Sequence, residues 1–397
     1  MKPKVPKRPL IMLTLNVAET YNKLIEQSQN QQKTKTNMTD EKGYFIAYEN
    51  QLVTGYATEY TIKKALGQGS FGRVMLVEYR DGSNSQQYAA LKICRAQPYF
   101  IDAMKQEIII FKMITASYPQ MTANFLEEFQ VKEHLCYSME LFDLTLYQAL
   151  KQTQGLGFDL NQIKVIARQF GKWLVEMQKL KIVHTDMKPE NMVLNKTDIS
   201  DIKLIDFGSG VLMDQPSRPT YIQSRFYRAP EITLGLRYDY KIDCWSIGAL
   251  LFELHTCYTC FPARSSPMLM KMFVSLMGLP PRELIMNDEG VLRAKVEKYF
   301  AKATVEYWND HAEKLKAVGL SQDSYIYLSE EVLDVEDRQQ CFKRQLRDLM
   351  VNKQWEGTAG HTQEDYNNFF ELINNLITWR TEDRWCGQQI LQSAFCQ

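Results

Sequence analysis

A series of short motifs follows in a fixed order between residues 66 and 231, and this order restricts the fold more than any other feature. The first motif has glycines at G-x-G-x-x-G spacing, in a segment that runs Leu66, Gly67, Gln68, Gly69, Ser70, Phe71, Gly72, Arg73 and Val74. The absent side chains let backbone N–H groups approach phosphate oxygens. The motif alone is weak evidence, because a glycine-rich hairpin is at least as common. A dinucleotide-binding fingerprint would open a helix here, and the strand-like run that follows disfavours it.

A lysine and a glutamate come next. Ala89-Ala90-Leu91-Lys92 sets a lysine within a strand-like run, and Glu107 lies on the inward side of an expected helix. A lysine in such a strand can hold nucleotide phosphates if a carboxylate orients it. The alternative is a surface lysine and an unrelated surface glutamate.

The segment from His184 to Asn191, H-T-D-M-K-P-E-N, is the strongest single signal. Asp186 can accept the proton of an attacking hydroxyl, Lys188 can neutralise a transferring phosphoryl group, and Asn191 can hold magnesium. Asp206 opens a D-F-G motif after an apolar run and offers a second metal ligand. An A-P-E motif ends at residue 231. This order of motifs is typical of protein kinases. His184 itself is interpreted as a structural residue of the loop.

Composition limits the class of protein. The chain has 397 residues with 47 basic and 47 acidic side chains, and 45% of its residues are hydrophobic. These values exclude a disordered protein and a basic nucleic-acid coat. We expect a monomer in the cytoplasm, the nucleus or both, without a secretory signal and without direct binding to nucleic acid or membrane. The eight cysteines are spread through apolar segments, which suits reduced thiols.

The periodicity of apolar residues predicts an α+β fold with a small β-rich lobe and a larger helical lobe. Strands are expected at 60–66, 74–79 and 88–94, followed by a helix after Pro98. A later apolar stripe predicts an amphipathic helix with Asp159 or Asn161 as its N-cap, and residues 242–254 predict a buried central helix. Residues 1–40 are rich in Lys, Pro, Gln and Asn and are expected to form a disordered tail.

The region from about Tyr44 onward resembles a eukaryotic protein kinase of the CMGC group, most similar to the dual-specificity tyrosine-phosphorylation-regulated kinase (DYRK) family. The resemblance is carried by T-Y-I-Q-S-R-F-Y-R-A-P-E at 220–231, D-L-T-L-Y at 143–147 and G-H-T-Q-E-D-Y at 360–366. Homeodomain-interacting protein kinases share the first segment, but the third is not expected in them. The resemblance implies a bilobal protein kinase fold. Its expected parts are an N-terminal extension at 41–59 and a kinase domain at 60–397, with an N-lobe at 60–140, a C-lobe at 144–397 and a CMGC-type insert at about 283–360.

The same resemblance assigns an ATP site. It implies that Met139 is the gatekeeper and that backbone groups of Glu140 and Phe142 bond the adenine edge. The side chains expected to sandwich the adenine ring are Leu66, Val74, Ala90, Leu194 and Ile205. Ordinary core packing is an equally compatible reading of those five residues.

The activation segment is expected from Asp206 to Glu231. By resemblance, Tyr221 is the tyrosine that such kinases phosphorylate on themselves, and Arg225 and Arg228 hold its phosphate. A buried tyrosine packed under two structural arginines is the alternative. Pro219 stands where relatives often have a first tyrosine, and Thr220 is a lesser candidate. Thr185 replaces the arginine that many kinases use to couple this phosphate to the catalytic loop, so we expect activation by self-phosphorylation that persists.

Other matches are structural. Asp243 is expected to bond the backbone of the catalytic loop, although a plain helix N-cap would look identical in the sequence. Glu231 is expected to pair with Arg384. A metal or redox site at His255, Cys257 and Cys260 is a weaker interpretation than core packing, because no second ligand pair accompanies them.

The resulting expectation is Mg-ATP-dependent phosphorylation of protein serine and threonine, with tyrosine phosphorylation confined to the chain itself. The resemblance implies a proline after the target residue and an arginine two or three residues before it, with Glu190 as a candidate partner of that arginine. A catalytically weak kinase-fold scaffold is the main alternative, and a small-molecule kinase is a lesser one.

Overall fold

The computed structural model describes residues 38–196, 198–214, 219–287, 291–317, 326–329 and 360–397. The predicted tail at 1–40 lies outside the described residues except for its last three positions, as does much of the predicted insert at 283–360. The chain divides into two compact units. Of the described residues, those from 38 to 101 together with 127–138 form the β-rich unit, and those from 102 to 126 and from 139 onward form the helical unit.

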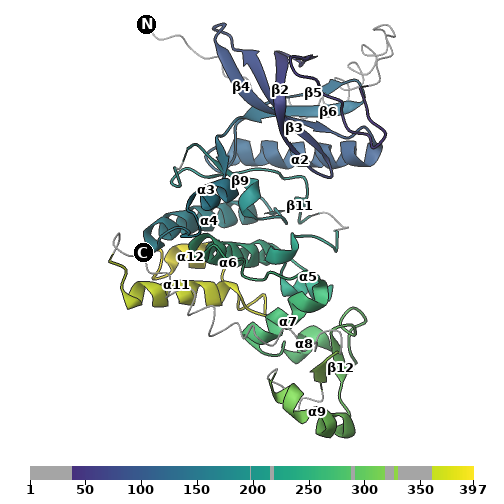
Figure 1. The fold of residues 1–397 in the computed structure, drawn as a ribbon, viewed down its shortest axis with the longest axis vertical. Helices are drawn as coiled ribbons and strands as arrows, with labels where there is room; N and C mark the ends of the chain where they lie inside the picture. Colours follow the sequence, from purple (N-terminus) through teal and green to yellow (C-terminus); the bar gives the residue numbers. More distant parts are fainter. Residues whose placement is uncertain (1–37, 197, 215–218, 288–290, 318–325, 330–359) are drawn as a thin grey trace. The chain divides into compact units, whose positions relative to one another are not determined.

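The β-rich unit is organised around a six-stranded sheet with the order β1-β2-β3-β4-β6-β5 (Figure 1). Its strands are β1 (Leu52–Thr54), β2 (Glu59–Gln68), β3 (Gly72–Arg80), β4 (Gln86–Cys94), β5 (Phe125–Val131) and β6 (His134–Glu140). Strands β1 to β4 pair antiparallel in sequence order. The three strands predicted from the sequence are therefore confirmed, each a little longer than its apolar pattern. β2 carries two register irregularities, at Ile62/Lys64 and Ala65/Gly67, just before the glycine-rich turn.

Alternating apolar side chains form the core of this unit. Tyr60, Val77 and Leu91, from three neighbouring strands, are almost completely buried in one cluster. The segment before β1 contributes to the same cluster, because Phe45 is buried in it and residue 45 forms an isolated bridge with Thr39. Part of the predicted N-terminal extension is thus integral to the unit's core.

Helices and short strands make up the helical unit. In chain order they are β7 (Leu144–Thr145), α3 (Leu146–Gln152), α4 (Leu160–Lys179), β8 (Ile182–Val183), η2 (Pro189–Asn191), β9 (Met192–Leu194), β10 (Lys203–Leu204), β11 (Val211–Leu212), η3 (Arg225–Tyr227), α5 (Pro230–Leu234), α6 (Lys241–Thr256), α7 (Ser266–Met277), α8 (Arg282–Ile285), β12 (Phe300–Lys302), α9 (Val305–Ala317), β13 (Ile326–Leu328), α11 (Gln363–Leu376) and α12 (Gly387–Gln392). The helix after Pro98, α2 (Pro98–Ser117), has most of its length in this unit.

Capping and burial explain the two central helices. Asp159 caps α4: its side chain accepts the Gln162 N–H, and Gln162 bonds back to the cap, so Asp159 rather than Asn161 is the N-cap. The predicted stripe of α4 is buried, and α6 is buried along almost its whole length. α6 packs against both α4 and α11, and α12 packs against α4 (Figure 1). No helix in the described part of the chain is both long and apolar enough to cross a membrane.

Candidate active site

Two small antiparallel sheets flank the predicted catalytic motifs. β8 pairs with β11, and β9 pairs with β10 and β7. The segment His184–Asn191 connects β8 to β9, and the segment from Asp206 to Gly208 lies between β10 and β11. The strands before and after one segment pair with those before and after the other, since β8 bonds to β11 and β9 bonds to β10. This pairing brings the two segments to the same place.

Asp186 lies at the centre of a polar network. Lys188 Nζ is 2.5 Å from Asp186 Oδ2. Asn191 Nδ2 donates to the main-chain oxygen of Asp186 at 2.9 Å and lies 3.2 Å from Oδ2. The structure therefore brings these three sequence-predicted residues together around one carboxylate, with the orientation of each side chain fixed by its neighbours.

Ser224 completes this network and was not singled out from the sequence. Its hydroxyl donates to Asp186 Oδ1 at 2.7 Å, its N–H donates to the same oxygen at 3.2 Å, and Lys188 Nζ lies 3.3 Å from the hydroxyl. The only sequence signal was its position inside the Q-S-R segment that carried the family resemblance. Nothing in spacing alone predicts that residue 224 meets residue 186.

Asp243 bonds the backbone of the predicted catalytic loop, as expected from the sequence. Its carboxylate accepts the N–H groups of His184 at 2.7 Å and Thr185 at 3.0 Å. Burial raises the pKa of Asp243 to about 7, although the two N–H donors act in the opposite direction. The position of the loop backbone therefore depends on one buried carboxyl group at the start of α6.

His184 is a buried structural residue. Its Nδ1 accepts the N–H of Asp186 at 3.2 Å, which leaves Nε2 to donate to the oxygen of Ile205 at 3.2 Å. Burial lowers the pKa of His184 below its ordinary value, so the ring is neutral at pH 7. It links the segment that contains Asp186 to the one that contains Asp206.

Thr185 and Asp206 both have left-handed backbone conformations, with φ of 66° and 64°. Such angles are uncommon for residues other than glycine and cluster at functional sites. The Thr185 hydroxyl donates to the oxygen of Ser209 at 2.7 Å. Where many kinases have an arginine, this chain thus has a short side chain bonded to the start of the activation segment.

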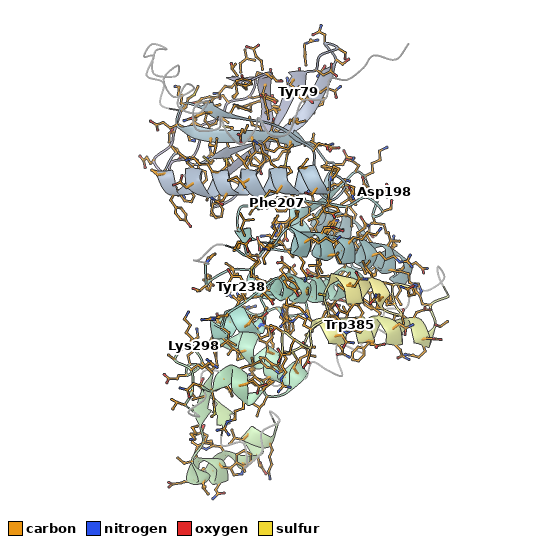
Figure 2. The ribbon with its side chains drawn as sticks, turned by 180° about the vertical axis from the view of Figure 1, so that it is seen from behind. Tyr79, Asp198, Phe207, Tyr238, Lys298 and Trp385 are labelled. Atoms are coloured by element: carbon orange, nitrogen blue, oxygen red, sulfur yellow. The ribbon has the colours of Figure 1, made fainter. Side chains whose placement is uncertain are left out.

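Glu107 lies beside the D-F-G motif within the helical unit. A Cβ added to Gly208 would be 3.2 Å from Glu107 Oε2 and 3.3 Å from Asp206 Oδ1, so both carboxylates approach this glycine. Phe207, labelled in Figure 2, is buried and makes ring contacts with Phe111 of α2 and with His184. These contacts join α2 to the catalytic segment.

The glycine-rich segment forms the turn between β2 and β3. Added Cβ atoms on Gly67 and Gly69 would meet nothing within 4 Å, whereas one on Gly72 would lie 2.1 Å from the oxygen of Ile93. The first two glycines leave open space beside the backbone, and the third is required by close packing on β4. Gln68, Ser70 and Phe71 fill the intervening positions of the turn.

Lys92 is buried on β4, opposite Val74 of β3, with its ammonium 5.9 Å from the centre of the Tyr137 ring. Lys92 belongs to the β-rich unit and Glu107 to the helical unit, so their pairing stays a prediction. Of the other proposed adenine contacts in the β-rich unit, Ala90 is buried on β4 and Leu66 is 46% exposed near the turn.

The remaining proposed ATP contacts lie in the helical unit. Met139 and Leu194 are buried, and Phe142 and Ile205 are half-buried. The Glu140 N–H donates to the oxygen of Asn124 at 2.9 Å, so any bond from this residue to adenine would come from its carbonyl.

Tyr221 is 72% exposed, so the alternative of a buried tyrosine is wrong. The Arg228 guanidinium lies 4.2 Å from its ring centre. Arg228, and to a lesser extent Arg225, lower the pKa of the Tyr221 hydroxyl. Arg228 also donates to the oxygens of Ile222 and Gln223, and Arg225 donates to the oxygen of Arg264. Two positive charges therefore accompany an accessible phenol.

A buried ion pair holds Glu231, at the end of the predicted activation segment. Arg384 donates from Nη1 and Nη2 to the two oxygens of Glu231, at 2.6 and 3.0 Å, and both side chains are almost fully buried. The predicted pairing is confirmed.

The histidine and cysteine cluster at the end of α6 packs as core. His255 Nδ1 bonds the oxygen of Phe158 at 2.9 Å, and Cys260 is buried. Within the described ranges, no three His, Cys, Asp or Glu side chains gather as a metal cage.

Comparison of the whole sequence with known proteins also points to a kinase. Residues 60–396 match the family described as the protein kinase domain. The chain therefore belongs to the protein kinase family. It is 36% identical over 245 residues to the dual specificity tyrosine-phosphorylation-regulated kinase mbk-2 of Caenorhabditis elegans, covering 61% of this chain and 29% of that protein.

Two further relatives have related names. Dual specificity tyrosine-phosphorylation-regulated kinase 3 of Mus musculus is 36% identical over 247 residues, which is 62% of this chain and 40% of the relative. Dual specificity tyrosine-phosphorylation-regulated kinase 2 of Drosophila melanogaster is 34% identical over 256 residues, which is 64% of this chain and 34% of the relative. The matched part is thus less than half the length of each relative. The predicted resemblance to the DYRK family and the predicted α+β kinase fold are confirmed.

Proposed function

We propose that this chain transfers the terminal phosphoryl group of Mg-ATP to serine and threonine side chains of proteins and to its own Tyr221. The observation that carries the proposal is the network in which Lys188, Asn191 and Ser224 all contact Asp186. Such a network orients one carboxylate and places a cation beside it, which is what phosphoryl transfer requires of a protein.

In the proposed reaction, the substrate hydroxyl oxygen forms a bond to the γ-phosphorus while the bond to the bridging oxygen breaks and ADP leaves. Asp186 orients the hydroxyl and accepts its proton. Lys188 neutralises negative charge on the oxygens of the phosphoryl group during its transfer. Lys92, oriented by Glu107, would hold the nucleotide phosphates.

Asn191 and Asp206 are the proposed magnesium ligands, and their chemistry fits this metal. The Asn191 Nδ2 bonds to Asp186 turn the amide oxygen away from that residue, and magnesium prefers amide and carboxylate oxygens. When bound there, the metal would supply positive charge that offsets the negative charge of the nucleotide phosphates.

Tyr221 is proposed as the site of self-phosphorylation. Its exposure and the adjacent guanidiniums of Arg225 and Arg228 support this, because a phosphate there would add about −1.5 to −2 charges next to two cations. The Thr185 bond to Ser209 is consistent with a catalytic loop that does not sense the phosphate through an arginine.

A preference for arginine before the target residue is also proposed. Glu190 is exposed at η2, and its charge raises the pKa of Glu253, which reaches about 7 chiefly through burial. The exposed carboxylate of Glu190 would favour a bound guanidinium. Proline after the target, a cytoplasmic or nuclear location, a monomeric state and the domain limits given above rest on the family resemblance.

The proposal is tested by mass spectrometry of purified wild type and Asp186→Asn after incubation with Mg-ATP and a degenerate peptide library. Wild type should place phosphate on Tyr221 and on peptide Ser or Thr, and Asp186→Asn should lose both. Asp198→Asn is the matched control, because Asp198 (Figure 2) is exposed and bonds only within its own turn in the described contacts.

Tyr221→Phe should remove most bound phosphotyrosine, with Tyr99→Phe, an equally exposed tyrosine at 72%, as its control. Unchanged phosphotyrosine in Tyr221→Phe would reject that site. Nucleotide binding without transfer in the wild type would favour the scaffold. Transfer to a small molecule with no transfer to peptides would favour the small-molecule kinase.

A further inference from the structure

A tyrosine from the N-terminal extension bonds the glycine-rich turn. The Tyr44 hydroxyl donates to the main-chain oxygen of Gly69 at 3.0 Å, and both residues belong to the β-rich unit. Gly69 is the central glycine of the G-x-G-x-x-G motif, and its N–H donates to the oxygen of Gly72 at 2.9 Å. The tip of the turn is therefore fixed by one bond inside the hairpin and one from outside it.

Two arginines hold the Tyr44 ring. The Arg73 and Arg95 guanidiniums lie 5.3 and 4.8 Å from its ring centre. Arg73 lies at the start of β3, and Arg95 directly follows β4. Arg95 also lies with Nη1 3.4 Å from the oxygen of Ser70 and donates to the oxygen of Lys42. We call Tyr44, Arg73 and Arg95 the Tyr44 clasp. Guanidiniums near an aromatic ring within about 6 Å stabilise its position.

The backbone beneath Tyr44 is equally well fixed. Asp40 Oδ1 accepts the Tyr44 N–H at 2.8 Å, and the Asp40 N–H donates back to the Tyr44 oxygen at 2.9 Å. The Gly43 oxygen accepts the N–H of Ala96, directly after the clasp's Arg95. The phenol is thus presented to the turn by a folded segment.

Peptide geometry converts this contact into an effect on the site. In a planar trans peptide the C=O of Gly69 and the N–H of Ser70 point in opposite directions. A bond that holds the Gly69 oxygen toward Tyr44 therefore directs the Ser70 N–H away from the extension. Gly69 has no side chain on that peptide, and its added Cβ would meet nothing, so side-chain packing does not fix the orientation.

We propose that Tyr44 is a positioning residue for nucleotide phosphates: its hydroxyl, acting through the Gly69 carbonyl, orients the Ser70 N–H toward the phosphates of ATP. This inference rests on the proposed function, since it assumes that the turn binds a nucleotide. It assigns a task in catalysis to a residue that precedes the predicted kinase domain.

The test is the Tyr44→Phe variant, which removes only the hydroxyl and leaves a ring between the two arginines. Isothermal titration calorimetry should show a Kd for Mg-ATP about threefold to tenfold higher than wild type, as expected for one lost hydrogen bond. The Kd for adenosine, which has no phosphates, should be unchanged. The KM for ATP should rise by the same factor while kcat stays within about twofold. Hydrogen exchange should accelerate at residues 69–72.

Tyr48→Phe is the matched control, because Tyr48 lies in the same extension and is 65% exposed. Unchanged ATP affinity in Tyr44→Phe would overturn the inference, as would an equal loss of adenosine affinity, which indicates general damage to the unit. A wild type that binds Mg-ATP but transfers no phosphate would refute the proposed kinase activity alone, and the two Kd values would still decide the role of Tyr44. A wild type that binds no nucleotide would overturn both.

Discussion

At Asp186, each carboxylate oxygen already has a donor before any substrate arrives. Oδ1 accepts from Ser224 and Oδ2 from Lys188, so the carboxylate cannot rotate without losing a charge-assisted bond. The side chain is therefore held in one orientation by its own chain. Its geometry depends as much on residue 224 as on the H-T-D-M-K-P-E-N motif.

Ser224→Ala should lower kcat by about tenfold to a hundredfold, because Asp186 and Lys188 both lose the shared hydroxyl. The KM for ATP should change little, since the Ser224 side chain bonds Asp186 and Lys188, neither of which is a proposed adenine contact. Steady-state kinetics on a peptide substrate provides the measurement. Ser224→Thr keeps the hydroxyl and should retain most of the activity; equal losses in both variants would contradict a role for that bond.

Glu253 provides a pH-dependent prediction. Burial raises its pKa to about 7, while its bond from the Tyr227 hydroxyl at 2.6 Å lowers it. The unfolded value is ~4.3, so the native state binds more protons between about pH 4.5 and 7, and this group reduces stability as pH rises through that window. Relative to wild type, Glu253→Gln should therefore gain unfolding free energy with rising pH, by ~1–3 kcal/mol between pH 5 and 8.

Chemical denaturation at pH 5, 6, 7 and 8 gives this difference. Asp243 also titrates near pH 7, but it is present in both proteins and cancels. Exposed Glu364→Gln is the control and should show a pH-independent difference. A flat difference for Glu253→Gln would show that folding does not raise the pKa of Glu253.

Among the elements, the β2–β3 hairpin uses its glycines for different purposes. Gly72 faces the oxygen of Ile93 so closely that a methyl group would lie 2.1 Å from it, whereas Gly67 and Gly69 have open space beside them. Gly72 is needed for the packing of β3 against β4, whereas Gly67 and Gly69 leave space beside the turn for a ligand. A single motif therefore contains one structural glycine and two that keep the turn accessible.

Gly72→Ala should lower the melting temperature by several degrees, because β3 must separate from β4 to admit the methyl group. Gly69→Ala should leave the melting temperature nearly unchanged and raise the KM for ATP. Scanning fluorimetry measures the melting temperatures of both variants, and steady-state kinetics measures their KM for ATP. A similar melting temperature for both would indicate that β4 yields without cost.

At the scale of the whole molecule, the ion pair between Glu231 and Arg384 connects positions 153 residues apart. Arg384→Met should destabilise the protein by about 3–5 kcal/mol, because it leaves a buried carboxylate without its partner. Arg380 pairs with Glu283 at an exposed site, with side chains 44% and 56% exposed, so Arg380→Met should cost less than about 1 kcal/mol. Denaturant unfolding gives the unfolding free energy of each variant. Equal losses in Arg384→Met and Arg380→Met would show that burial adds no cost to breaking the Glu231–Arg384 pair.

Much of this organisation could be predicted from residue order. The strands of the glycine-rich hairpin, the cap of α4 and the burial of α6 follow from local periodicity and capping chemistry, and the roles of Asp243 and Arg384 followed from the family resemblance. The contact of Ser224 with Asp186 and that of Tyr44 with Gly69 could not be predicted. Each joins a side-chain hydroxyl to a distant backbone oxygen or carboxylate, and only tertiary folding decides which of many similar residues makes such a contact.

The long separation of Glu231 and Arg384 also sets an order in time. At ~5–20 residues per second, a ribosome adds Arg384 roughly 8 to 30 s after Glu231. During that interval the Glu231 carboxylate has no guanidinium to accompany it into the interior and stays in water. We therefore expect the end of the activation segment to be among the last parts of the helical unit to close during synthesis.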